Sequence, residues 1–198
     1  MKKIYSPLLI ILFFSSAPFL FAQDALPEEG KASAKLRFLL TGALEFGGDE
    51  VAKVYFTNGK TQSVKAGQGG AIGAGVQLGL GASEKFLLRG TVGFKYVTTQ
   101  ADNAHIRLTR VPINLTANIM ATEKFRLGAG IAMHNAIKFK ADGIGSDFSL
   151  KNASGPIFEI AYRGVGISYT AMKYTDNLNE TYSANAIGIT LSGVFPRK

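Results

Sequence analysis

Apolar side chains alternate with small or polar ones through most of this chain. Over 125–133, for example, Leu127 and Ile131 share one side while Arg126 and Gly128 share the other. A period of two predicts β-strands with one apolar and one polar face, because successive side chains of a strand point to opposite sides. The same alternation recurs over 36–46, 71–80, 86–97 and 186–195.

Counting these segments predicts about eight strands joined alternately by short turns and long loops. Short polar joins are expected at 83–85, 122–124 and 163–164, and longer ones at 47–69, 99–104, 140–154 and 176–183. Short turns at one rim and long loops at the other are typical of transmembrane barrels. The strands are expected near 34–46, 70–81, 85–98, 105–120, 124–139, 155–162, 164–175 and 184–195.

Two details of the pattern lead to separate expectations. Asn58-Gly59 is typical of a two-residue hairpin turn, which predicts a hairpin extending the first long loop. The alternative is two further barrel strands, although the arms are shorter than the roughly 9–11 residues that span a bilayer. The alternation also changes phase between Leu108 and Val111, which predicts a β-bulge or a register change near Pro112.

The nature of the second face distinguishes between two kinds of β-protein. A soluble sandwich or lipocalin-like barrel also alternates, but it turns bulky apolar side chains inward and charges outward. Here the second face is small or polar, as in Gly73, Gly75, Gly130, Gly188 and Thr190. Such residues suit a narrow lumen that holds a few long charged side chains, with the apolar face toward lipid. We therefore predict an all-β fold, a closed antiparallel transmembrane β-barrel.

Aromatic side chains near the strand ends predict two girdles at the membrane surfaces. The rings of Phe86, Phe125, Tyr162 and Phe195 are expected at the inner rim, and those of Tyr96, Phe139 and Tyr174 at the outer rim.

The N-terminus predicts export. Residues 1–22 combine Lys2 and Lys3, a short apolar core over 8–14 and Ala22 at the expected cleavage position, which is typical of a signal peptide. Residues 23–33 are expected to form a periplasmic lead-in, and 34–195 the outer-membrane barrel domain. The net charge is +8. An exported protein rarely meets nucleic acid, so we expect lipid headgroups rather than nucleic acid as the anionic partner.

The stretch 34–195 resembles the small outer-membrane β-barrel proteins of Gram-negative bacteria, the group that includes OmpX and the OmpA transmembrane domain. The segments over 56–78 and 111–115 carry this resemblance. The closing strand over 187–195 resembles the C-terminal signal read by the barrel-insertion machinery, although 196–198 follow its final aromatic residue. The resemblance implies the cell outer membrane, with outer-membrane lipid, lipopolysaccharide and the insertion machinery as partners, and an external partner that is unknown.

Seven titratable residues fall on the polar faces of their strands and are expected to line the lumen. Buried charges must be paired or hydrated, and eight strands leave an interior just filled by side chains. We therefore expect a structural cluster of ion pairs, with a gate or narrow pore for small solutes as the alternative. The seven are Arg37, Glu45, Arg89, Lys95, Arg126, His134 and Glu159.

The sequence predicts no reaction. His134 and His105 are the only histidines, and the neighbours of His134 supply neither a serine nor an acid for a catalytic triad. A lipid A-modifying hydrolase or acyltransferase remains a second alternative. Two histidines without cysteine give no metal-ligand spacing, and no cofactor is expected. We predict a structural or surface-interaction role.

Overall fold

The computed structural model describes part of the chain and leaves the N-terminus out. The predicted signal peptide over 1–22 and the lead-in over 23–33 therefore lie outside the described residues. Within the described ranges, no helix has the length and apolar character needed to cross a membrane. The described ranges are 34–55, 61–101, 104–141 and 145–196.

Long strands dominate the described residues, as the alternation predicts. Most of the predicted boundaries agree with the observed strands to within a few residues. The strands are β1 (Ala34–Phe46), β2 (Glu50–Tyr55), β3 (Thr61–Lys65), β4 (Gly69–Leu80), β5 (Phe86–Ala101), β6 (Ala104–Met120), β7 (Phe125–Lys140), β8 (Phe148–Ser149), β9 (Ala153–Tyr162), β10 (Val165–Thr170), β11 (Lys173–Thr175), β12 (Thr181–Ser183) and β13 (Ala186–Phe195).

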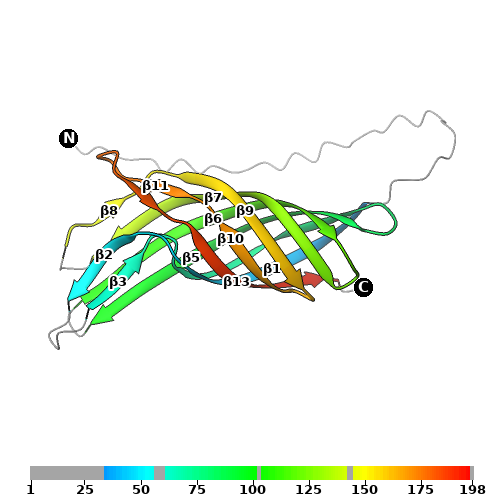
Figure 1. Cartoon of the computed structure of the whole chain (residues 1–198), viewed down its shortest axis with the longest axis horizontal. Helices are drawn as coiled ribbons and strands as arrows, with labels where there is room; N and C mark the ends of the chain where they lie inside the picture. The colour runs from blue at the N-terminus through cyan, green and yellow to red at the C-terminus, as the bar shows by residue number, and fades with distance from the viewer. Residues whose placement is uncertain (1–33, 56–60, 102–103, 142–144, 197–198) are drawn as a thin grey trace, which may run out of the picture. The chain divides into compact units, whose positions relative to one another are not determined.

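Eight of the described strands pair in a ring. Starting at β1, the order is β4, β5, β6, β7, β9, β10 and β13, which pairs again with β1, and every pairing is antiparallel. Neighbouring strands follow one another along the chain apart from small hairpins, so the barrel is an up-and-down meander (Figure 1). The predicted all-β antiparallel barrel of about eight strands is confirmed.

Two hairpins stand outside the ring. β2 pairs with β3 in a separate sheet, so the hairpin predicted to extend the first loop is confirmed, and the alternative of two further barrel strands is wrong. Its predicted turn at Asn58-Gly59 lies outside the described residues. The strand expected over 164–175 is wrong in its second half. β10 ends at Thr170, and β11 leaves the ring to pair with β12, because Met172 turns into a buried apolar cluster.

The outer surface of the ring carries an apolar band on all eight strands. Ile72 is 73% exposed, Leu115 54% and Ile131 55%, although each belongs to a regular paired strand. Water would disfavour so large an apolar surface on a monomer. Exposed members include Leu44 of β1, Ile72 of β4, Val92 of β5, Leu115 of β6, Ile131 of β7, Ile160 of β9, Ile167 of β10 and Ile189 of β13.

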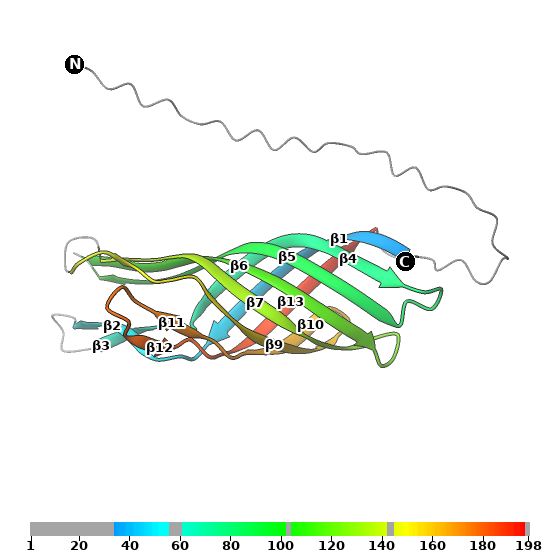
Figure 2. The ribbon, with the colours of Figure 1, turned by 90° about the horizontal axis from the view of Figure 1, so that it is seen from above.

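Beyond one edge of this band, the apolar side chains change to the inside. We call this part the extension. It consists of the far ends of β5, β6 and β7 with β8 and the two hairpins, gathered at one end of the ring (Figure 2). Its interior is a buried cluster that includes Val64, Val97, Ile106, Leu108, Ile137, Phe139, Leu150, Met172 and Tyr174.

The extension explains two expectations that fail. Phe139 and Tyr174 do not form an outer aromatic girdle, because both side chains are buried in the apolar cluster. The Phe139 ring instead stacks on Phe148 of β8, with ring centroids 4.6 Å apart. Tyr96 does lie on the outer side, where its hydroxyl and the His105 Nε2 are 3.1 Å apart.

The register change predicted near Pro112 is present, but it does not cause the phase change of the apolar pattern. Along β6, Leu108, Arg110 and Pro112 are all buried, so the strand keeps one face inward throughout. The apolar side chains of β6 lie on the inner face in the extension and on the outer face in the band, because the two parts have different surroundings. A register shift does occur opposite Thr109–Val111, but the additional residue lies on β7, at Ala136 with φ of 49°.

Candidate functional site

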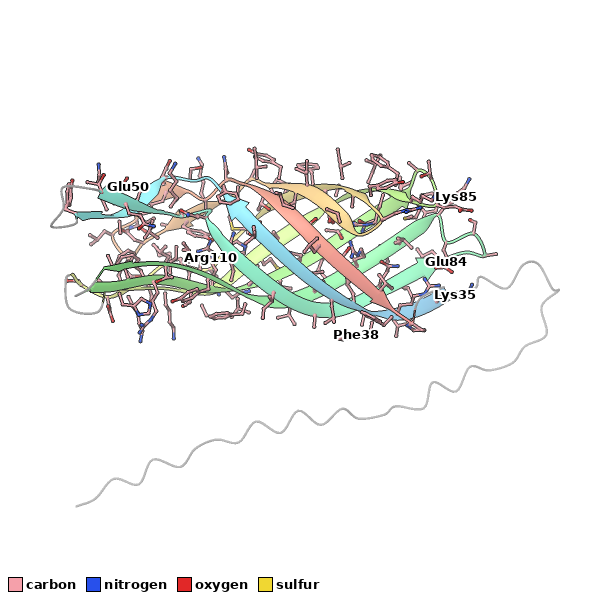
Figure 3. The ribbon with its side chains drawn as sticks, turned by 90° about the horizontal axis from the view of Figure 1, so that it is seen from below. Lys35, Phe38, Glu50, Glu84, Lys85 and Arg110 are labelled. Atoms are coloured by element: carbon pink, nitrogen blue, oxygen red, sulfur yellow. The ribbon has the colours of Figure 1, made fainter. Side chains whose placement is uncertain are left out.

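The structure places all seven predicted lumen residues inside the ring, in three groups along its axis. β1 contributes Arg37 and Glu45, β5 contributes Arg89 and Lys95, β7 contributes Arg126 and His134, and β9 contributes Glu159. Strand tilt brings residues distant in sequence to one level. Figure 3 shows Lys35 and Glu84 at one end of the ring, Glu50 of β2 in the extension and Arg110 between them.

The first group lies at the end with the short turns. The Arg37 guanidinium donates two hydrogen bonds to the Glu84 carboxylate, one of them 2.8 Å long from Nη2 to Oε1. The Lys35 Nζ lies 3.2 Å from the same Oε1. The turn between β4 and β5 places Glu84 with φ of 48°, and its side chain is only 3% exposed. A turn carboxylate therefore folds inward and closes part of this mouth.

The second group puts two guanidinium groups on one carboxylate. Arg126 Nη1 lies 2.9 Å from Glu159 Oε2, and Arg89 Nη1 lies 3.6 Å from the same oxygen. The Thr190 hydroxyl donates to the other oxygen, Oε1, at 2.8 Å. Arg126 Nη1 also donates to the Asn118 side-chain oxygen at 2.5 Å. Glu159 is thus the centre of this cluster.

The third group lies where the band meets the extension. The Lys95 ammonium forms an ion pair with Glu45 and donates to the Gly67 carbonyl at 2.8 Å. Arg110 is fully buried, donates to the Gln68 carbonyl and lies over the Tyr174 ring, 5.9 Å from its centroid. Here the lumen charges contact the backbone of the segment between β3 and β4.

Glycines opposite these side chains make the room they occupy. A Cβ at Gly188 would lie 2.6 Å from Glu45 Cγ, and one at Gly79 would lie 2.8 Å from Glu84 Oε2. A Cβ at Gly128 would lie 2.3 Å from the Asn118 side-chain oxygen. The alternation of glycine with bulky apolar residues therefore serves both faces, since it leaves volume inside for long polar side chains.

Several lumen residues were not predicted. Glu84 has the polar context of an exposed turn, and nothing in the sequence signals that it folds inward. Arg110 could have been found by extending the even-numbered polar face of Asn114, Thr116 and Asn118 back through the phase change. Other buried polar side chains outside the predicted seven include Gln77, Asn118, Ser168, Thr170 and Tyr174.

His134 is paired with a phenol. Its Nδ1 lies 2.5 Å from the Tyr174 hydroxyl, inside the barrel, and its side chain is buried. The hydrogen bond described for this ring thus joins it to neither a serine nor a carboxylate, the partners a triad requires. No group of three or more potential metal ligands occurs among the described residues.

Tyr174 provides a testable property of this group. Burial raises the pKa of Tyr174 to about 12, and the nearby Arg110 guanidinium opposes this shift while Glu45 adds to it. The folded state therefore holds the phenol proton more tightly than the unfolded state does. The resulting stabilisation is complete below about pH 10 and is lost as the pH rises toward the folded value.

An absorbance titration of tyrosinate is expected to show one component well above pH 10. Tyr174→Phe should remove that component, because burial raises the pKa of this phenol. If the Tyr174→Phe variant instead lost tyrosinate absorbance that appears below about pH 10, the phenol would not be buried as described.

Comparisons with known proteins add little. No protein-family model matches the chain, and no curated protein matches it. A crystal structure of Ail, the attachment invasion locus protein of Yersinia pestis, is similar at 8% identity and a TM-score of 0.40, covering 80% of this chain and 97% of Ail. A structure of Ail in complex with the heparin analogue sucrose octasulfate is similar at 7% identity and a TM-score of 0.37, covering 82% of this chain and 99% of Ail. This likeness assigns neither family nor function.

Proposed function

We propose that this protein is an outer-membrane β-barrel with a structural or surface-interaction role and no reaction of its own. The observation that carries the proposal is the reversal of polarity along the barrel. In the band, apolar side chains point outward and charges point inward. In the extension, the apolar side chains point inward. Both arrangements are accounted for if a bilayer surrounds the band and water surrounds the extension.

The ring of paired strands meets the main requirement of the bilayer. Backbone N–H and C=O groups find no partner in hydrocarbon, so each strand must pair on both sides. The eight strands do so through the pairing of β6 with β7. The hydrogen-bonded ring of eight strands and the outward apolar band together support the proposal that the barrel spans a membrane.

The ends of the barrel suggest an orientation. Short turns are typical of the periplasmic side and longer loops of the outside. The turns at 83–85, 122–124 and 163–164 would then face the periplasm, and the extension would face outward. We infer outer-membrane lipid and lipopolysaccharide as neighbours, with the insertion machinery as a transient partner, while the external partner stays unassigned.

The interior favours this role over its two alternatives. Ion pairs cross the lumen at three levels, and the apolar cluster of the extension packs over its outer end. That arrangement supports a stiffened barrel over a pore. A lipid-modifying enzyme is disfavoured because His134 is buried inside the barrel and hydrogen-bonded to Tyr174, so an acyl chain on the lipid-facing surface has no route to it.

Four measurements test the proposal. Cell fractionation should recover the protein in the outer membrane, and its gel migration should change on heating. Protein reconstituted in a planar bilayer should show no single-channel steps, and expression should leave lipid A acylation unchanged. Recovery in the soluble periplasm would contradict the membrane assignment. Steady conductance that changes in Arg126→Ala would favour the pore, and altered lipid A that depends on His134 would favour the enzyme.

A further inference from the structure

The lumen carries more positive than negative groups. Among the interior residues that the structure describes, five cationic side chains meet three carboxylates. A buried charge without a counter-charge is costly, so an excess of this kind calls for another anion or for water. The cations are Arg37, Arg89, Lys95, Arg110 and Arg126, and the carboxylates are Glu45, Glu84 and Glu159.

Part of this excess faces a cavity at the end with the short turns. The cavity has a volume of about 510 Å³, and the side chains of Arg37, Arg89 and Arg126 line it together with Glu84 and Gln77. We call it the vestibule. Lys124 and Arg163 from the two neighbouring turns also line it, with Glu123. Cations therefore surround the vestibule at two depths.

Two of these guanidinium groups retain unused donors. The Arg89 Nε and one terminal nitrogen of Arg126, Nη2, have no hydrogen-bond partner, although each side chain is only 7% exposed. Both arginines already share a single carboxylate oxygen of Glu159, and Arg89 is 3.6 Å from it. The carboxylate therefore leaves one positive charge and at least two N–H groups unmatched.

The register of three strands concentrates the cations further. Arg37 of β1 is opposite Gln77 of β4, and Gln77 is opposite Arg89 of β5. A neutral amide thus stands between two cations at a position where a carboxylate would supply a further counter-charge. The barrel keeps this position uncharged.

We propose that the vestibule binds a small oxyanion of the phosphate class from the solution at this end of the barrel. Guanidinium groups prefer oxyanions because their N–H donors match two acceptor oxygens at once. A tetrahedral phosphate can accept from Arg89 and Arg126 together while balancing the remaining charge. The vestibule opens at an end of the ring, within the strands, so its ligand enters from water.

The experiment measures binding of inorganic phosphate to the folded full-length chain in a phosphate-free amine oxide detergent. Calorimetric titrations at constant ionic strength, balanced with sodium chloride, should show saturable binding at a single site. Gln77→Glu should weaken it by about tenfold or more, because the new carboxylate lies opposite Arg89, lowers the positive charge of the vestibule and repels the ligand. This variant is expected to fold, since it adds a counter-charge without changing side-chain size.

A matched control uses the same chemical change elsewhere. Gln62 is exposed on β3 in the extension. Gln62→Glu should leave the affinity within about twofold, because solvent screens a distant surface charge. Arg89→Gln should weaken phosphate binding as Gln77→Glu does, if the variant folds.

Three results would overturn the proposal. The first is an absence of saturable phosphate binding beyond that of chloride. The second is normal binding by folded Gln77→Glu protein. The third is an equal loss in Gln62→Glu, which would trace the binding to overall charge. All three leave the membrane assignment untouched, so failure here is separable from failure of the proposed function.

Discussion

Glu159→Gln is expected to lower the free energy of unfolding by about 3–5 kcal/mol, the range seen when one member of a buried ion pair is removed. The Glu159 carboxylate accepts from Arg126, pairs with Arg89 and is only 13% exposed. The amide keeps the shape of the side chain but leaves two guanidinium groups without a counter-charge. The loss therefore reports charge pairing and not packing.

Urea unfolding in detergent, followed by heat-modifiable gel migration, measures this effect. Glu123→Gln is the matched control, since Glu123 is exposed in the turn between β6 and β7. It should change stability by less than about 0.5 kcal/mol, as is usual for exposed positions. Equal stability of the Glu159→Gln variant and the parent would show that the Arg89–Arg126–Glu159 cluster is hydrated and contributes little.

Leu115→Arg is expected to cost about 2–4 kcal/mol in a bilayer, the penalty for arginine at the centre of the lipid-facing surface of a barrel. Leu115 is 54% exposed and lies opposite Gly90 and Ile131, in the middle of the apolar band. In water the same substitution at so exposed a position would be almost neutral. The free-energy cost of Leu115→Arg therefore shows whether lipid or water covers the apolar band.

The measurement is the folding equilibrium in lipid vesicles over a urea gradient. Ser149→Arg is the control, because Ser149 is exposed on β8 of the extension and should tolerate arginine. Similar stability of both variants would indicate that the band is in water. Leu115→Arg and Ser149→Arg, together with Glu159→Gln, establish which side of the barrel wall faces lipid.

The inward position of many candidate-site residues was predictable from the alternation along each strand alone. A strand alternates strictly, so any charged residue on the face opposite the apolar set must point into the ring. That rule places Arg37, Arg89 and Glu159 inside without knowledge of their partners. It could not reach Glu84, since a turn residue belongs to neither face.

The extension shows the limit of the pattern. Leu108 and Phe139 continue the alternation as apolar residues, but the face that is apolar in the extension is the inner one. A sequence records which residues share a face and does not record which solvent covers it. The prediction that Phe139 and Tyr174 form an outer girdle failed for this reason.

The sequence by itself determined most of the ring strands and the residues that share a face of each strand, because these follow from local periodicity. Only the tertiary structure decided how the charges pair. Strand tilt brings Arg126 of β7 beside Glu159 of β9, and an inward turn brings Glu84 to Arg37. Pairing across a lumen depends on the stagger of strands distant in sequence, and no local pattern encodes that distance.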